Sequence, residues 1–148
     1  MRYLEDFEVG QRLHYRSPGL SRAQIMQFAG EWDPQRLHLD EAYATAIHGS
    51  LIASGFQTML AVFQPIMAGL MRDCANIGGV GLDELRWLRP VRPDEPLEIG
   101  LEVRAVTPSR SKPDRGVMTY SVTATNPAGE VVLTCLAPVM MRRRPNED

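Results

Sequence analysis

Residues 54–70 read SGFQTMLAVFQPIMAGL, and this apolar stretch decides the fold. Its large apolar side chains recur at helical spacing, which predicts one long helix that begins near Gly55. Pro65 lies inside this helix and should kink it, because proline removes a backbone hydrogen bond and crowds the preceding turn. The large apolar side chains are predicted to form one stripe, made of Phe56, Met59, Leu60, Phe63, Met67 and Leu70.

The charge-free region is longer than the helix, since no charged residue occurs from Gly49 to Met71, over 23 positions. That length is enough to span a bilayer. However, Gln57, Gln64 and Pro65 interrupt the apolar run, and no basic flank would orient it in a membrane. A helix that is apolar on nearly all sides is also typical of one buried inside a water-soluble protein. We therefore expect a buried helix and no membrane span.

Beyond residue 79 the apolar period changes from that of a helix to that of a strand. Apolar and polar side chains alternate over residues 97–105 and again over residues 118–125, which predicts two half-buried strands. The sequence Asn126-Pro-Ala-Gly129 predicts a turn into a further strand over residues 131–141. Two more strands are predicted, over residues 12–16 and 82–91.

The strand predicted over residues 131–141 has two unusual features. Most of its side chains are apolar on both faces, which predicts that both faces are covered. Pro138 lies inside it, which predicts an edge position or a bulge, because proline cannot donate a ladder hydrogen bond. One central helix covers only one face of a sheet, so we expect a second copy of the chain, in a homodimer, to cover the rest.

The predicted order is one strand, several short helices, one long apolar helix and then four strands joined by short turns. One antiparallel sheet of five to six strands, wrapped around a long central helix, satisfies this order and gives an α+β fold. A chain of 148 residues is most simply one domain, over residues 1–148. Its content of 44% hydrophobic and 23% charged residues is that of a globular protein.

Charge and cysteine content argue against several classes of protein. The formal charge of −2 gives no electrostatic reason to bind nucleic acid. Cys74 and Cys135 are too few and too far apart for a disulfide framework or a metal site, which favours two reduced thiols in the cytoplasm. Residues 1–10 contain several charged side chains and no apolar run, so no signal peptide is expected.

The segment Asp33-Pro-Gln-Arg-Leu-His38 holds the first candidate for chemistry. A carboxylate and an imidazole joined by a proline-containing turn can converge on one water molecule as a general acid–base pair. The carboxylate would hold the imidazole tautomer while either group accepts the proton of the water. A structural alternative stays open, in which Asp33 caps a helix that begins at Pro34 and His38 only packs or ties a loop.

Ser54-Gly55, at the start of the long helix, is the second candidate. The first N–H groups of a helix have no intrahelical partner and lie at its positive end, so they stabilise a developing oxyanion. Glycine lets a substrate carbonyl approach the backbone closely. The alternative is that Gly55 only permits a tight turn into the helix. His14 and His48 are expected to be structural or exposed, because a lone histidine carries little specificity.

These motifs and their order are similar to those of the MaoC-like dehydratases, the family of (R)-specific enoyl-CoA hydratases. The resemblance rests on Asp-x4-His-Leu-Asp over residues 33–40, the glycine at the start of the apolar helix, and GLDELRWLRPV over residues 81–91. The opening LEDFEVGQ, residues 4–11, also resembles the start of that family. The resemblance implies a hot-dog fold, a homodimer, and reversible hydration of trans-2-enoyl-CoA to (R)-3-hydroxyacyl-CoA. The catalytic residues that it implies are Asp33, His38 and the oxyanion donor Gly55.

The sequence departs from the family pattern around this pair. Where the usual segment reads Asp-x-Asn-Pro-x-His, this chain has Gln35 and Arg36, so an amide lies one methylene further out and a cation is added. Ser54 replaces a histidine before the glycine, and Phe63 falls where some relatives carry a helix hydroxyl. Thr58 is the nearest substitute for that hydroxyl. The residues expected to bind the substrate are therefore Gln35, Arg36, Ser54 and Thr58.

The sequence favours an acyl-CoA hydratase or dehydratase that needs no metal or redox cofactor, since CoA is part of its substrate. Two alternatives remain open: a hot-dog acyl-CoA thioesterase, since one fold hosts both reactions, and an acyl-CoA-binding protein that has lost activity. The loop Ser109-Arg-Ser-Lys112 either meets CoA phosphates or is an ordinary solvated hairpin. Residues 142–144 are predicted to be a charged terminus.

Overall fold

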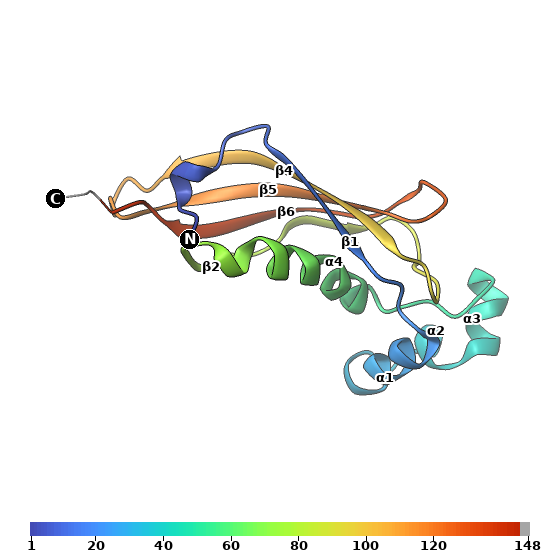
Figure 1. Cartoon of the computed structure of the whole chain (residues 1–148). Helices are drawn as coiled ribbons and strands as arrows, with labels where there is room; N and C mark the ends of the chain where they lie inside the picture. The colour runs from blue at the N-terminus through green and yellow to red at the C-terminus, as the bar shows by residue number, and fades with distance from the viewer. Residues whose placement is uncertain (146–148) are drawn as a thin grey trace.

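The computed structural model describes residues 1–145 as a six-stranded antiparallel sheet over one long helix, with three shorter helices at one end (Figure 1). The strands pair in the order β1–β4–β5–β6–β2, and β3 also pairs with β6. The strands are β1 (Arg12–Ser17), β2 (Asn76–Gly79), β3 (Asp83–Trp87), β4 (Leu97–Pro108), β5 (Arg115–Thr125) and β6 (Val131–Arg142). The helices are α1 (Arg22–Trp32), α2 (Arg36–Leu39), α3 (Glu41–His48) and α4 (Gly55–Gly69), with 3₁₀ turns over Leu4–Asp6 and Met71–Asp73.

The long helix α4 lies along the curved inner face of the sheet, as Figure 1 shows. Val62 and Ile66, one turn apart on α4, are fully buried against it. Alternate residues of β4 from Leu97 to Val103 are buried, because successive side chains of a strand point to opposite faces. These observations confirm the predicted α+β hot-dog fold. No helix among residues 1–145 has the length and hydropathy needed to cross a membrane.

The stripe predicted on α4 is confirmed only in part, since Leu70 is buried and Met59 and Phe63 pack against the core. Phe56, Leu60 and Met67, which were predicted to share the core stripe, are 53%, 55% and 39% exposed. For these three residues the prediction was wrong, because α4 is apolar on most of its sides and periodicity alone does not select the side that the sheet covers. Within the described part of the chain, these three side chains of α4 remain largely in contact with solvent.

On its outer side, β6 pairs with two short edge strands. The first, β2, ends at Gly79, and the second, β3, begins at Asp83. Pro138 of β6 lies opposite the break between them, where the Val80 N–H donates to the Pro138 carbonyl (3.1 Å). The proline is therefore not on an edge strand, and it lies where the neighbouring ladder is interrupted. The strand predicted over residues 82–91 is correspondingly short.

Burial along β6 alternates between buried and half-buried residues. The chain itself therefore covers one face of this strand fully and the other only in part. The helix layer packs on one side of the sheet only, so coverage of the other face by a second copy of the chain stays a prediction.

The helices α1, α2 and α3 extend beyond one end of the sheet, opposite the end where the termini lie (Figure 1). Ser21 caps α1 by accepting from the Gln24 N–H (3.1 Å), as predicted. Asp40 caps α3 in the same way by accepting from the Tyr43 N–H (3.0 Å). These two caps fix the segment that contains Asp33 between α1 and α3, close to the start of α4.

Candidate active site

Asp33 lies at the C-terminal end of α1 rather than at the start of α2. Its backbone N–H donates to the Ala29 carbonyl (3.0 Å), and Gln35 is the residue that precedes α2. The alternative in which Asp33 caps a helix beginning at Pro34 is therefore wrong. Pro34 ends α1, because a residue before proline is disfavoured in helical geometry. The Asp33 carboxylate is left to bond with other side chains.

Three side chains surround this carboxylate. Gln35 Nε2 donates to Asp33 Oδ1 (2.7 Å), and Ser54 Oγ donates to Asp33 Oδ2 (2.7 Å). His38 Nε2 lies 3.3 Å from the same Oδ2. The structure thus brings Asp33 and His38 together, and it places Gln35 and Ser54, which the sequence assigned to the substrate, on the carboxylate itself.

Asp33 and His38 are both buried, with side chains that are 11% and 6% exposed. The hydrogen bond from Ser54 holds the pKa of Asp33 below its usual value. Burial acts in the opposite direction, while the Gln35 hydrogen bond and the nearby His38 lower the pKa further. The carboxylate is therefore ionised at neutral pH and is able to accept a proton or a hydrogen bond.

The tautomer of His38 follows from its second partner. Its Nδ1 lies 2.8 Å from the Ile52 carbonyl oxygen, which can only accept, so Nδ1 carries a proton. The nitrogen that can gain or lose a proton is then Nε2, the one that faces Asp33. In its protonated form Nε2 donates to the carboxylate, and in its neutral form it presents a lone pair to any donor between them.

Ser54 precedes α4, yet its side chain does not cap the helix. Its hydroxyl proton is used on Asp33 instead. The first N–H of α4 belongs to Gly55, and among residues 1–145 no backbone acceptor bonds to it. Unpaired N–H groups at a helix N-terminus carry partial positive charge. The start of α4 therefore offers uncapped donors close to the Asp33–His38 pair.

Trp87, at the end of β3, covers one side of Gly55. Its indole Nε1 donates to the Gly55 carbonyl (2.8 Å), and a Cβ placed on residue 55 would lie 2.6 Å from Trp87 Cε2. Close packing thus favours glycine here, whatever its N–H does, because any larger residue would have to displace the indole ring. No pattern in the sequence assigned a role to Trp87, and its place in the GLDELRWLRPV segment was the one available signal.

Two other predicted residues do not bond to the pair. Arg36 bonds to Asp40 Oδ2 (2.9 Å), and its guanidinium carbon lies 4.3 Å from the centre of the Tyr43 ring. Its side chain is 67% exposed, so the cation expected beside the pair is directed toward α3 instead. Thr58 is buried on α4, four residues after Ser54 and therefore on the same side of the helix.

Gln57 is a buried polar residue that the sequence analysis did not single out. Its Nε2 donates to the Gln24 carbonyl (3.1 Å), which joins α4 to α1. Its Oε1 has no partner among the described residues. Together with the Ser54 and His38 hydrogen bonds, this contact docks the α1–α2 segment on the start of α4.

The remaining histidines lie elsewhere. His14 pairs with Glu98 (2.9 Å) on the exposed side of β1 and β4, and His48 ends α3, where its carbonyl accepts from Arg92. Within residues 1–145, no three side chains of His, Cys, Asp or Glu gather where they could hold a metal ion.

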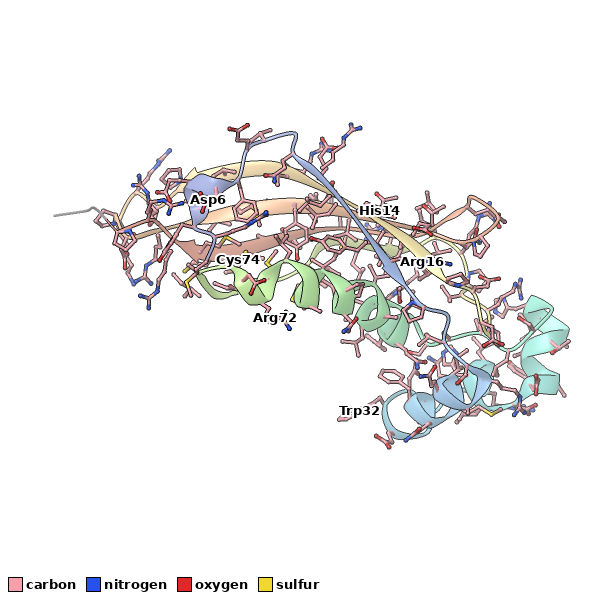
Figure 2. The ribbon with its side chains drawn as sticks, in the orientation of Figure 1. Asp6, His14, Arg16, Trp32, Arg72 and Cys74 are labelled. Carbon is pink, nitrogen blue, oxygen red and sulfur yellow. The ribbon has the colours of Figure 1, made fainter. Side chains whose placement is uncertain are left out.

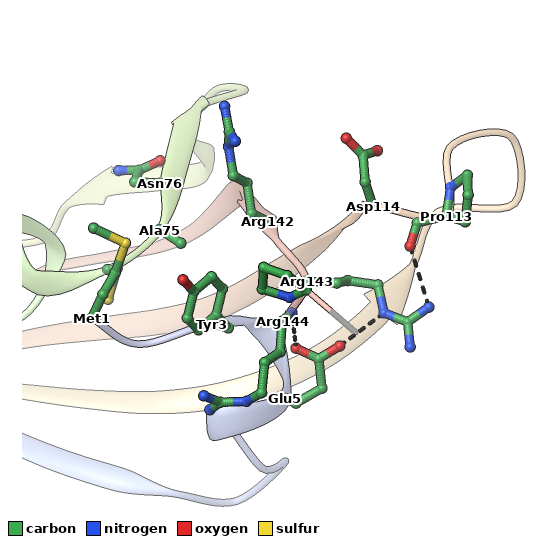
Figure 3. A pocket seen from close by; sticks show the side chains of 12 residues that line it. Met1, Tyr3, Glu5, Ala75, Asn76, Pro113, Asp114, Arg142, Arg143 and Arg144 are labelled. Carbon is green, nitrogen blue, oxygen red and sulfur yellow. Dashed lines mark hydrogen bonds and ion pairs between the residues drawn. The ribbon is translucent and has the colours of Figure 1, made fainter. Parts of the chain in front are cut away.

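Two cavities occur at the end of the molecule where the termini lie. The larger, about 1450 Å³, lies beside the termini, where Arg143 donates to Glu5 (2.8 Å), as Figure 3 shows. The smaller, about 450 Å³, is lined in part by the loop Ser109–Lys112. Neither cavity is lined by Asp33 or its partners. Within a single chain, the Ser109–Lys112 loop therefore does not line the candidate site.

Comparison with known proteins agrees with this fold. Residues 6–126 match the family described as MaoC like domain. The uncharacterized protein YdeM of Bacillus subtilis (strain 168) is 34% identical over 125 residues, which are 83% of this chain and 86% of that protein. A MaoC-like dehydratase from Rhodospirillum rubrum is 40% identical with a TM-score of 0.88, over 99% of this chain and 100% of that one. The unliganded R-hydratase PhaJ1 of Pseudomonas aeruginosa is 27% identical with a TM-score of 0.70, over 96% and 86%. The chain therefore belongs to the MaoC-like domain family.

Proposed function

We propose that the protein catalyses the reversible hydration of trans-2-enoyl-CoA to (R)-3-hydroxyacyl-CoA. Its family and its similarity to an R-hydratase support hydratase or dehydratase chemistry in general. The observation that carries the finer proposal is the buried Asp33–His38 pair beside the uncapped start of α4. An ionised carboxylate, an imidazole nitrogen that exchanges a proton and a free N–H are the groups that addition of water to an enoyl thioester requires.

In this proposal Asp33 and His38 hold one water molecule against the substrate. As the water oxygen bonds to Cβ, the electrons of the double bond move toward the thioester carbonyl. At the same time the Asp33–His38 pair accepts one proton from the water. The Gly55 N–H stabilises the negative charge that develops on the thioester oxygen. The pair then returns the proton to Cα, so the protein regains its starting state. CoA arrives with the substrate, and the reaction needs no metal or redox group.

The other residues of the site take different parts. We assign Gln35 and Ser54 to holding Asp33, because each donates to one of its oxygens. Thr58 is our proposed substrate contact on α4, since it is buried on the same side of the helix as Ser54. Arg36 is exposed and bonded to Asp40, so we propose that it reaches only the part of the substrate that stays in solvent.

A panel of enoyl-CoA substrates of different chain length tests this function. Hydration is followed by the loss of enoyl-thioester absorbance, and the configuration of the product is determined by chiral chromatography. Turnover to the (R)-hydroxyacyl product supports the proposal, and no turnover at any chain length overturns it. Release of free thiol would identify a thioesterase instead. Thermal stabilisation by acyl-CoA without turnover would identify a binding protein.

The proposed partner is a second copy of this chain. Phe56, Leu60 and Met67 form an apolar stripe on α4 that remains 53%, 55% and 39% exposed, although the Trp87 ring of β3 touches Phe56 at one end of it. A homodimer that covers this stripe would remove it from water, as burial of apolar surface favours. Light scattering is expected to give a molar mass twice the 16.6 kDa of one chain. Leu60→Glu should shift the mass toward the monomer, and a monomeric wild type at micromolar concentration would contradict the proposal.

The proposed location is the cytoplasm. Cys74 and Cys135 are both buried free thiols. Persistent thiols are typical of proteins in a reducing compartment. Fractionation of cells that produce the protein is expected to recover it with the cytoplasmic marker, and recovery outside that fraction would contradict the assignment.

A further inference from the structure

Trp87 makes an unusual contact for a residue at the end of an edge strand. Its indole ring lies so close to Gly55 that three ring atoms would be 2.6–2.9 Å from a Cβ at that position. No real Cβ tolerates such distances to a ring whose own place is fixed. A side chain at the first position of α4 would therefore displace the Trp87 ring, so the contact favours glycine there, although glycine is a poor helix former.

The ring is held in place from two sides. Trp87 pairs with Leu133 in the β3–β6 ladder, and the next residue, Leu88, donates its N–H to the Val132 carbonyl (2.9 Å). On the other side, the Phe56 ring meets the indole edge to face, with centroids 5.8 Å apart and planes at 78°. Trp87 thus links the sheet to the first turn of α4, since its backbone pairs with β6 and its ring packs on Phe56.

The hydrogen bond from Trp87 falls on the peptide group that follows Gly55. Nε1 donates to the Gly55 carbonyl, which shares its peptide plane with the Phe56 N–H. The Gly55 N–H belongs to the peptide group on the other side of the same Cα. The hydrogen bond from Trp87 fixes the peptide plane after this Cα, and the indole ring covers the Cα, so both contacts limit the backbone rotation of Gly55. Glycine is otherwise the residue with the most backbone freedom.

Stability alone is a weak reason for this arrangement. Trp87 remains 46% exposed, so much of its apolar surface is not buried by the contact. A hydrogen bond in contact with solvent adds little net stability, because water can replace it. The same indole lies beside the uncapped donors at the start of α4, so its contact with Gly55 also bears on the chemistry at those donors.

We propose that Trp87 is a positioning residue that holds the first turn of α4, and with it the Gly55 N–H, where the thioester oxygen of the substrate binds. This inference rests on the proposed hydratase function. It adds a residue of β3 to a site otherwise built from α1, α2 and α4. It also predicts that Trp87 lies close enough to a bound acyl thioester to sense it.

The chain has two tryptophans, which makes Trp87 accessible to fluorescence. Trp32, the last residue of α1, is 72% exposed and points away from the sheet (Figure 2). In a Trp32→Phe background Trp87 is the sole tryptophan. Titration with butyryl-CoA, a saturated thioester that cannot be hydrated, should change its emission saturably, while free CoA without an acyl group should change it less.

Kinetics in the same background separates positioning from packing. Trp87→Phe keeps a ring but loses the N–H, and we expect kcat to fall about tenfold with KM nearly unchanged, because misplacement of an oxyanion donor affects the transition state. Leu88→Ala, on the neighbouring exposed residue, is the matched control and should leave kcat unchanged. A purely structural Trp87 would lower Tm but not kcat measured well below Tm.

The two measurements also distinguish failure of this inference from failure of the function. If the parent hydrates enoyl-CoA and Trp87→Phe has an unchanged kcat, the positioning role is overturned while the function stands. If the parent shows no hydration, the function fails, and the emission titration decides whether Trp87 lies at the thioester site. An emission that does not respond to butyryl-CoA overturns that placement in either case.

Discussion

Replacing Ser54 by alanine removes the donor that contributes most to the lowered pKa of Asp33. Ser54 is fully buried, and its Oγ lies 2.7 Å from Asp33 Oδ2. A hydrogen bond to a charged group is worth about 1.5–3 kcal/mol, and alanine leaves part of a buried carboxylate unpaired. We therefore expect Ser54→Ala to lower the free energy of unfolding by about 2 kcal/mol at neutral pH. In a chain of this length that corresponds to a fall in Tm of roughly 4–8 °C.

The pH dependence of this loss identifies its origin. Because the pKa of Asp33 is lower in the folded chain than in the unfolded chain, the ionised carboxylate stabilises the fold above its unfolded pKa. That contribution is lost as the pH falls through the folded pKa. Without Ser54 the folded pKa rises toward the unfolded value, so the variant has less of this stability to lose. The gap between wild type and variant should be widest near neutral pH and narrow below about pH 4.

Urea unfolding at several pH values measures the stability, and the pH profile of kcat/KM measures the base. We expect the acid limb of the profile to move to higher pH in Ser54→Ala, since Asp33 is then protonated more easily. Ser17→Ala is a matched control, because Ser17 is also buried but its hydroxyl lies 3.4 Å from a neutral carbonyl. Equal losses in the two variants at every pH, with an unmoved acid limb, would refute the reasoning.

Four further substitutions probe other parts of the site. Asp33→Asn and His38→Ala should each lower kcat by about 10²- to 10⁴-fold, and the double variant by far less than the product, because the two groups act together; near-normal hydration by folded Asp33→Asn would contradict the assignment. Gly55→Ala should displace Trp87 and cost about 1–3 kcal/mol, measured by thermal unfolding; an unchanged Tm and kcat would contradict the close contact. Arg36→Ala should raise KM by less than about fivefold, as for an exposed ion pair, with kcat unchanged; a fall in kcat would place Arg36 at the reacting atoms.

Local patterns in the sequence predicted the parts of the site that local geometry determines. Asp33 and His38 are joined by a short turn that Pro34 enforces, so their proximity follows from the segment itself. The groups that fix their orientation, Ser54 and the Ile52 carbonyl, come from the segment just before α4, 21 and 14 residues further along the chain than Asp33 and His38. Such contacts depend on how helices dock, and spacing along the chain does not report docking.

Local patterns in the sequence also could not determine which side of α4 is buried. Phe56, Leu60 and Met67 are as apolar as the residues that meet the sheet, so a count of apolar positions could not separate the two sides. Gln57 and Thr58, which are polar, are on the buried side because partners or space for them exist there. Tertiary contacts selected the face, and the sequence pattern allowed either choice.

The departures from the family pattern take on a different meaning once the site is known. Gln35 and Ser54 replace the Asn and His of that pattern, and they suggested altered recognition of the acyl chain. In the structure each donates to one oxygen of Asp33, so both changes act on the base of the proposed reaction. Because Ser54 is the largest cause of the lowered pKa of Asp33, the pH range of activity is where these substitutions should have their main effect. Chain-length preference should depend instead on residues such as Thr58 and Phe63, farther along α4.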